Sequence, residues 1–117
     1  MSYEKVLRTS FASLLQQYED GADTHGNAVL LPVPSDCHVV SALSYMIEGM
    51  HFLPGTSADV IAYKALIHNY AKLASYGAKP SWVQCNISMP VIEPSWLDQF
   101  ANGLGDALQH YGGAITS

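Results

Sequence analysis

Charged side chains are scarce in this 117-residue chain: Asp, Glu, Lys and Arg make up 13% of it, against roughly 25% in ordinary soluble domains. Apolar residues, at 49%, are as frequent as usual. So few charges do not suffice to cover an isolated domain of this size, and part of its surface is therefore expected to meet another chain. The composition favours an oligomer.

Basic residues are especially few, and the formal net charge is −5. The five of them are scattered along the sequence: Lys5, Arg8, Lys64, Lys72 and Lys79. A nucleic-acid-binding protein needs a clustered basic face, so this function class is excluded.

Long apolar runs are also missing. None approaches the ~20 residues that span a bilayer, and the first 15 residues contain no signal-peptide core. The two cysteines, Cys37 and Cys85, have no CxxC or Cys/His spacing, which predicts reduced thiols and a cytoplasmic protein. The histidines His25, His38, His68 and His110 show no paired spacing on one expected face, so no metal site is expected.

The pattern of apolar residues predicts one domain over residues 1–117 with the order α-β-β-α-β-α-β. Apolar residues at three- and four-residue steps predict a helix over Tyr3–Glu19. A second helix is expected from a Thr56 or Ser57 cap to Tyr76, with Gly77 as its stop and apolar or small residues on nearly every side. A third is expected from Pro94 to the Gly112-Gly113 pair.

Four strands are expected between and after these helices. Apolar stretches and period-two alternation place them at Ala28–Val33, Val39 to about Ile47, Trp82–Met89 and Ala114–Thr116. The first two are expected to pair as a hairpin through the turn at Pro34-Ser35-Asp36.

Two motifs connect this pattern to a known family. The first motif is the run Ile47-Glu48-Gly49-Met50-His51-Phe52-Leu53-Pro54. The second is the run Ala62-Tyr63-Lys64-Ala65-Leu66-Ile67-His68-Asn69, which is followed by Gly77-Ala78-Lys79-Pro80. In both, the chain resembles the N-terminal domain of the thiamine-monophosphate kinases, which are AIR-synthase-related ATP-dependent enzymes. The resemblance extends from about Val29 to the C-terminus.

The resemblance implies an α+β fold in which a four-stranded sheet packs on helices. It also implies that two such sheets close a barrel across a dimer, which would remove exposed strand edges. The residues expected near this seam are Val39, Ser41, Leu43, Tyr45, Trp82, Gln84 and Asn86.

Kinases of this family hold Mg²⁺-ATP with aspartates at fixed positions, and this chain departs from that pattern. The corresponding residues here are Asn27, Ser44 and Lys72, and a fourth position would lie past Ser117. One gap in the alignment would instead place Asp23 at the first position. Mg²⁺ prefers carboxylate oxygens, and a lysine ammonium repels it. We therefore expect no catalytic residue and no cofactor.

A relic of the substrate groove is a weaker expectation, with His51, Asn69 and Lys72 as candidate ligand-binding residues. Lys72 would bind a phosphate or sulfate in place of the metal, or would instead reach solvent or pair with Glu48. Asn69 and His51 have equally simple structural readings as residues that satisfy nearby backbone groups.

Three functions follow from these observations. The first is a non-catalytic interaction protein that forms a homodimer or joins a full-length homologue and regulates it. The second is a truncated or split kinase component that binds Mg²⁺ and ATP and phosphorylates thiamine monophosphate. The third is a metal-free binder of a small anion.

Overall fold

The computed structural model describes residues 10–11, 24–25 and 28–116, with the backbone alone for residues 24, 25, 28 and 29. The helix expected over Tyr3–Glu19 lies outside the described residues, except for Ser10 and Phe11. Asn27 and Asp23, the candidates for the first aspartate position, lie outside them as well.

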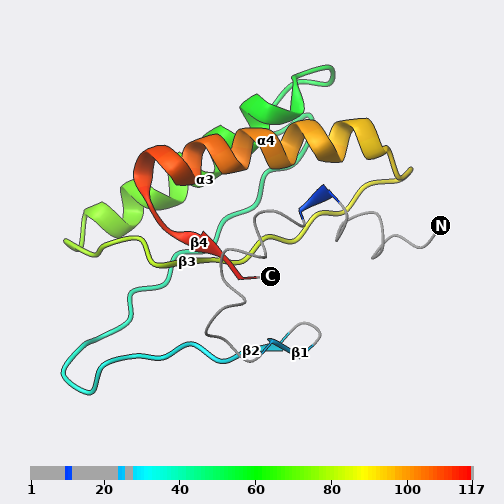
Figure 1. Cartoon of the computed structure of the whole chain (residues 1–117). Helices are drawn as coiled ribbons and strands as arrows, with labels where there is room; N and C mark the ends of the chain where they lie inside the picture. Colours follow the sequence, from blue (N-terminus) through cyan, green and yellow to red (C-terminus); the bar gives the residue numbers. More distant parts are fainter. Residues whose placement is uncertain (1–9, 12–23, 26–27, 117) are drawn as a thin grey trace.

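Two helices, α3 (Ala58–Ala74) and α4 (Pro94–Tyr111), form one layer of the molecule and run in the same direction (Figure 1). Their starts are as predicted, because Ser57 is the N-cap residue of α3 and Pro94 opens α4. The helix α3 ends two residues before the predicted Tyr76, and Gly77 (φ 69°) follows in a left-handed conformation. Gly112 (φ 88°) ends α4, as predicted.

The strands are much shorter than the sequence predicts. Thr24–His25 (β1) pairs antiparallel with Ala28–Val29 (β2). Trp82–Val83 (β3) pairs parallel with Ala114–Ile115 (β4), with Trp82 opposite Ala114 and Val83 opposite Ile115. The described residues therefore contain two separate two-stranded sheets in place of one four-stranded sheet. The parallel β3–β4 pair flanks α4 in sequence, as in a βαβ unit.

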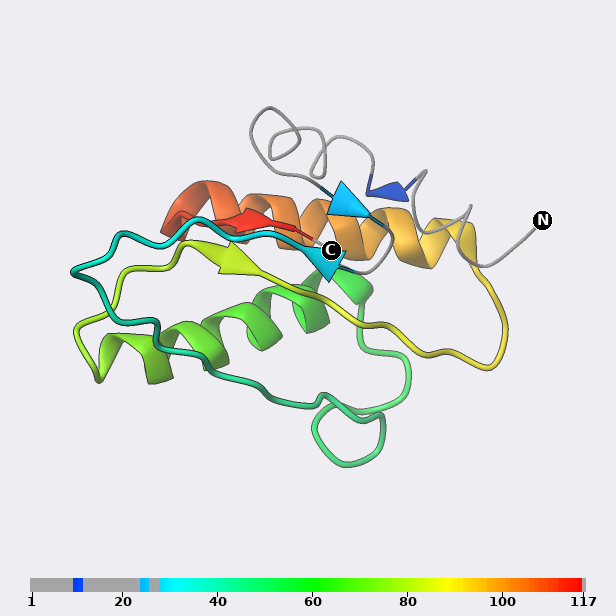
Figure 2. The ribbon, with the colours of Figure 1, turned by 90° about the horizontal axis from the view of Figure 1, so that it is seen from below.

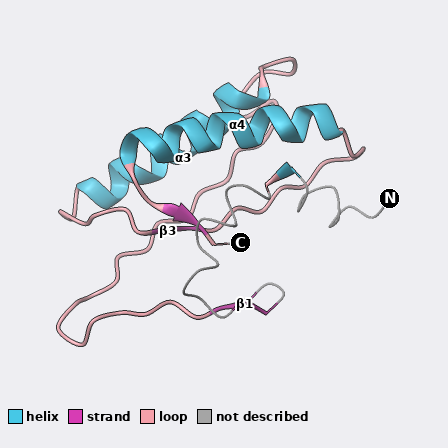
Figure 3. Ribbon diagram, viewed as in Figure 1, coloured by secondary structure: helices cyan, strands magenta, loops and turns pink. Residues whose placement is uncertain are grey.

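The expected second strand, Val39 to Ile47, joins no ladder in the described structure. The segment 30–47 runs out to a turn and back without regular pairing. Its first limb lies on the side of β3 and β4 away from the helices, and its second limb returns toward α3, where Ser44 contacts Asn69 (Figures 2 and 3). Its side chains nevertheless alternate as a strand requires: Ala42, Ser44 and Met46 are half-buried, and their neighbours are exposed. The period-two pattern thus predicted which side chains turn inward, but it did not determine a pairing partner.

The core lies between the two helices and the segments beneath them. It comprises Phe11, Ala58, Ile61, Ala62, Leu66, Leu97, Phe100, Ala101, Leu104, Ala107, Leu108 and Ile115. Phe100 stands at its centre, with its ring 6.1 Å from that of Phe11 and 5.3 Å from that of Trp96. On α4 the buried side chains include Leu97, Phe100, Leu104 and Leu108, which form one apolar stripe, whereas Tyr111 at its end is exposed.

One expectation for α3 is wrong. The sequence predicts a helix covered on nearly every side, but the structure exposes Val60, Lys64, His68 and Ala71. The cause is geometric, since these four residues recur at three- and four-residue steps on the face of the helix opposite the buried Ala58, Ala62 and Leu66. No helix in the described part of the chain is long and apolar enough to cross a bilayer.

Gly103 allows α3 and α4 to approach closely. A Cβ atom at this position would collide with the Cα and carbonyl oxygen of Asp59 in the first turn of α3. The Gly103→Ala variant must separate the helices, because backbone atoms cannot rotate away as a side chain can. We expect about 1–3 kcal/mol lower stability, as is typical of an overpacked core, measured by denaturant unfolding. The neighbouring exposed Asn102→Ala is the control and should be neutral or slightly stabilising. Equal stabilities of the two variants would contradict the close approach.

The two cysteines are free thiols, as predicted, but their surroundings differ. Cys37 is exposed, whereas burial raises the pKa of the Cys85 thiol to about 11. Since the thiolate is the reactive form, iodoacetamide at about pH 8 should modify Cys37 far faster than Cys85. Mass spectrometry of timed samples measures both rates. The rate at Cys85 should rise as the pH approaches 11 in the folded protein, and comparable rates at about pH 8 would contradict the burial.

Candidate functional site

The centre of the candidate site is a contact between α3 and the segment of residues 30–47, which we call the extended segment. The amide nitrogen Nδ2 of Asn69 donates to Oγ of Ser44 at 2.7 Å and to the carbonyl oxygen of Ala65 at 3.0 Å. Because a carbonyl only accepts hydrogen bonds, the Ala65 contact fixes which way the Asn69 amide points. The opposite atom, Oδ1, is buried and accepts no hydrogen bond from the described residues.

Lys72 lies one helical turn beyond Asn69, in the last turn of α3. Positions three apart share a helix face, so the ammonium belongs to the same region as Ser44 and Asn69. Lys72 is exposed, and its charge is favourable near the negative end of the helix dipole. No ion pair joins it to Glu48 within the described residues. The structure thus favours the solvent-reaching reading of Lys72 over the paired one.

These three side chains are a poor match for Mg²⁺. The Ser44 hydroxyl is occupied by an amide donor, Asn69 turns its N–H groups toward it, and Lys72 adds a positive charge nearby. Mg²⁺ demands oxygen ligands in near-octahedral geometry, usually including carboxylates. No group of three His, Cys, Asp or Glu residues that could hold a metal ion occurs among the described residues. We therefore assign no chemical step to a metal here.

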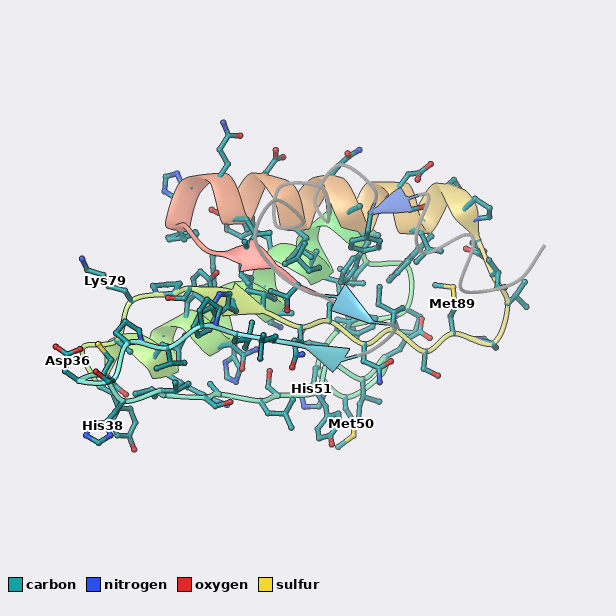
Figure 4. The ribbon with its side chains drawn as sticks, turned by 60° about the horizontal axis from the view of Figure 1, so that its bottom comes forward. Asp36, His38, Met50, His51, Lys79 and Met89 are labelled. Atoms are coloured by element: carbon teal, nitrogen blue, oxygen red, sulfur yellow. The ribbon has the colours of Figure 1, made fainter. Side chains whose placement is uncertain are left out.

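The third candidate, His51, makes its contacts elsewhere. Its ring nitrogen Nδ1 accepts a hydrogen bond from the backbone N–H of Ile47 at 3.0 Å. The backbone N–H of His51 donates to the Ile47 carbonyl at 2.8 Å. Nζ of Lys64 on α3 donates to the His51 carbonyl at 2.9 Å. Figure 4 shows His51 and Met50 on one loop, far from the turn that carries Asp36 and His38. The structure therefore brings Ser44 and Asn69 into contact, places Lys72 one helical turn beyond Asn69, and gives His51 a local bonding role.

A row of apolar side chains on the extended segment is the other feature of the region. Leu43 is 80% exposed, Tyr45 72% and Val39 59%, and Ser41 between them is exposed too. Of the other expected seam residues, Gln84 and Asn86 are exposed beyond β3, while Trp82 is half-buried.

Three residues extend this row beyond the prediction: Leu30, Val33 and Ile47 are all exposed. The first two belong to a stretch that the sequence pattern describes as a buried strand. The apolar character of this stretch was the signal that could have marked Leu30 and Val33 as candidate interface residues, since apolar side chains are normally buried. We call Leu30, Val33, Val39, Leu43, Tyr45 and Ile47 the apolar row.

Comparisons with known proteins agree with the motifs. The model of the AIR synthase related protein N-terminal domain matches residues 25–117. The thiamine-monophosphate kinases of Haemophilus influenzae and Escherichia coli K12 are each 33% identical over 85 residues, 73% of this chain and 26% of theirs. That of Corynebacterium glutamicum is 29% identical over 106 residues, 83% of this chain and 32% of its own.

The chain therefore spans about a quarter of the length of the first two kinases. The family match covers most of the chain, including both helices and the extended segment. The chain belongs to the AIR synthase related protein family, whose N-terminal domain it represents.

Proposed function

We propose that this thiamine-monophosphate-kinase-like domain acts by association and performs no catalysis of its own. Its partner would be a second copy of the chain or a full-length homologue that it regulates, and a link to thiamine biosynthesis would follow from the second case. The proposal rests above all on the apolar row, because this surface has no occupant within the described chain.

The apolar row has the character of an unfilled interface. Val39, Leu43, Tyr45 and Ile47 occupy alternate positions of one extended run and so lie on one face of it, and exposed apolar patches mark binding surfaces. Among the described residues the backbone of the segment has no ladder partner, and an open strand edge readily pairs with another chain. Both properties suit a partner that supplies strands, as in the barrel that the family resemblance implies.

The lack of catalysis rests on charge. A dication placed between Ser44 and Lys72 would meet one neutral hydroxyl and one ammonium, and the ammonium would repel it by several kcal/mol at a few ångströms. Phosphoryl transfer needs such ions to neutralise the phosphate oxygens. The hydrogen bond between Ser44 and Asn69 supports this reading, since it occupies the hydroxyl without a ligand.

One observation favours the alternative of a split kinase component. The relatives are named thiamine-monophosphate kinases, and this chain corresponds to only 26% of their length. A separate polypeptide could supply the remainder, together with further ligands for Mg²⁺-ATP. The remaining alternative, an anion site without metal, draws on the exposed ammonium of Lys72.

The association proposal predicts that a charge in the apolar row weakens the dimer. Tyr45→Lys should raise the dimer dissociation constant at least about fivefold, because a tyrosine at the centre of an interface commonly contributes more than about 1 kcal/mol. Sedimentation velocity over a concentration series measures this constant. Folding of the variant should be unchanged, since the side chain is 72% exposed.

Tyr76→Lys is the matched control for this experiment. Tyr76 is 78% exposed but follows α3, outside the apolar row, and its replacement should leave association unaltered. A wild-type chain that stays monomeric at high micromolar concentration, alone and with a full-length homologue, would refute the association proposal.

Nucleotide binding separates the proposal from the split-kinase alternative. We expect that Mg²⁺ with millimolar ATP leaves the melting temperature of the wild type unchanged, because only ligand binding to the folded state would raise it. The double variant Ser44→Asp with Lys72→Asp places carboxylates at two of the positions where the family resemblance expects aspartates. This variant should become stabilised by Mg²⁺. Magnesium-dependent stabilisation of the wild type by ATP would instead establish the split-kinase alternative.

A further inference from the structure

The loop of residues 47–56, which leads into α3, is held by a network of short hydrogen bonds. The Ile47 carbonyl accepts from the N–H groups of Met50 at 3.0 Å and His51 at 2.8 Å. Farther along, the N–H of Gly49 donates to the Phe52 carbonyl at 2.7 Å. The loop also presents two apolar side chains, since Met50 and Leu53 are among its exposed residues.

The imidazole of His51 closes this network. Its Nδ1 accepts a hydrogen bond from the backbone N–H of Ile47 at 3.0 Å, and the His51 backbone donates to the Ile47 carbonyl. His51 therefore bonds both the N–H and the carbonyl of Ile47. An imidazole nitrogen accepts a hydrogen bond only when it carries no proton. The contact therefore requires the neutral ring with its proton on Nε2.

Protonation of the ring reverses the role of Nδ1. Both nitrogens of the imidazolium are donors, so Nδ1–H would face the N–H of Ile47 and the contact could not persist. Histidine is the side chain that ordinarily changes charge between about pH 5 and 8. We propose that His51 is a pH-sensitive latch, closed when neutral and released on protonation. The closed latch holds the N–H of Ile47, the residue at which the apolar row ends and the loop 47–56 begins.

Two charged residues belong to the surroundings of the latch. Lys64 on α3 donates from Nζ to the His51 carbonyl at 2.9 Å, and Glu48 lies in the loop itself. Ile47 ends the apolar row, so release of the latch removes the hydrogen bond of its N–H, while its carbonyl keeps the bonds from Met50 and His51. The inference does not depend on the proposed function, because it concerns only contacts within one chain.

Hydrogen exchange of the Ile47 amide, followed by NMR from about pH 8 to about pH 5, tests the latch. After correction for the intrinsic exchange rate, the protection of Ile47 should fall about fivefold or more, the factor expected for one lost hydrogen bond. The Asn side chain in His51→Asn offers an oxygen near the position of Nδ1 and does not titrate. This variant should keep its protection across the whole range.

His38→Asn is the matched control, because His38 is exposed on the distant turn (Figure 4) and should leave the wild-type response intact. Nitrogen shifts of the wild-type His51 ring provide a test that needs no variant and should show the proton on Nε2 at neutral pH. A proton on Nδ1, a protection of Ile47 that does not change with pH, or the same fall in His51→Asn would each overturn the proposal.

Discussion

The close approach of α3 and α4 at Gly103 is the constraint on which the described fold depends. Since this position has no Cβ atom, the α4 backbone lies directly against Asp59, and the small side chains Ala58, Ala62 and Ala107 are fully buried. The position of α4 then determines where β3 and β4 lie, because both strands are attached to it in sequence and pair in parallel. Tyr70 secures the far end, where its hydroxyl donates to the Gly112 carbonyl at 2.7 Å.

The extended segment is attached to this helical layer by neutral contacts. The Ser44–Asn69 hydrogen bond joins its middle to α3, and a typical bond of this kind contributes about 1 kcal/mol. A metal cluster at the same place would hold the segment only when the ligand is bound. A neutral bond needs no ligand, which is consistent with the proposed association.

The sequence predicted the helices far better than the sheet, and the reason is physical. Helix ends are determined by local chemistry, so Ser57, Pro94 and Gly112 were sufficient to place them. Strand pairing depends on residues far apart, and the alternation over Val39–Ile47 indicates only which side chains turn inward. The resemblance brought Ser44, Asn69 and Lys72 to one region, but the link from His51 to Ile47 arises from loop geometry that no spacing reveals.

The apolar row explains the low charge of the chain. Leu43 and Tyr45 are so exposed that their burial contributes little to the stability of one copy, and charged residues would fit there equally well. The same holds for Leu30 and Val39. A monomer gains little from apolar groups at these positions, and the proposed association would account for them. A partner that covers the row would bury these side chains and pair the open backbone beneath them in a single step.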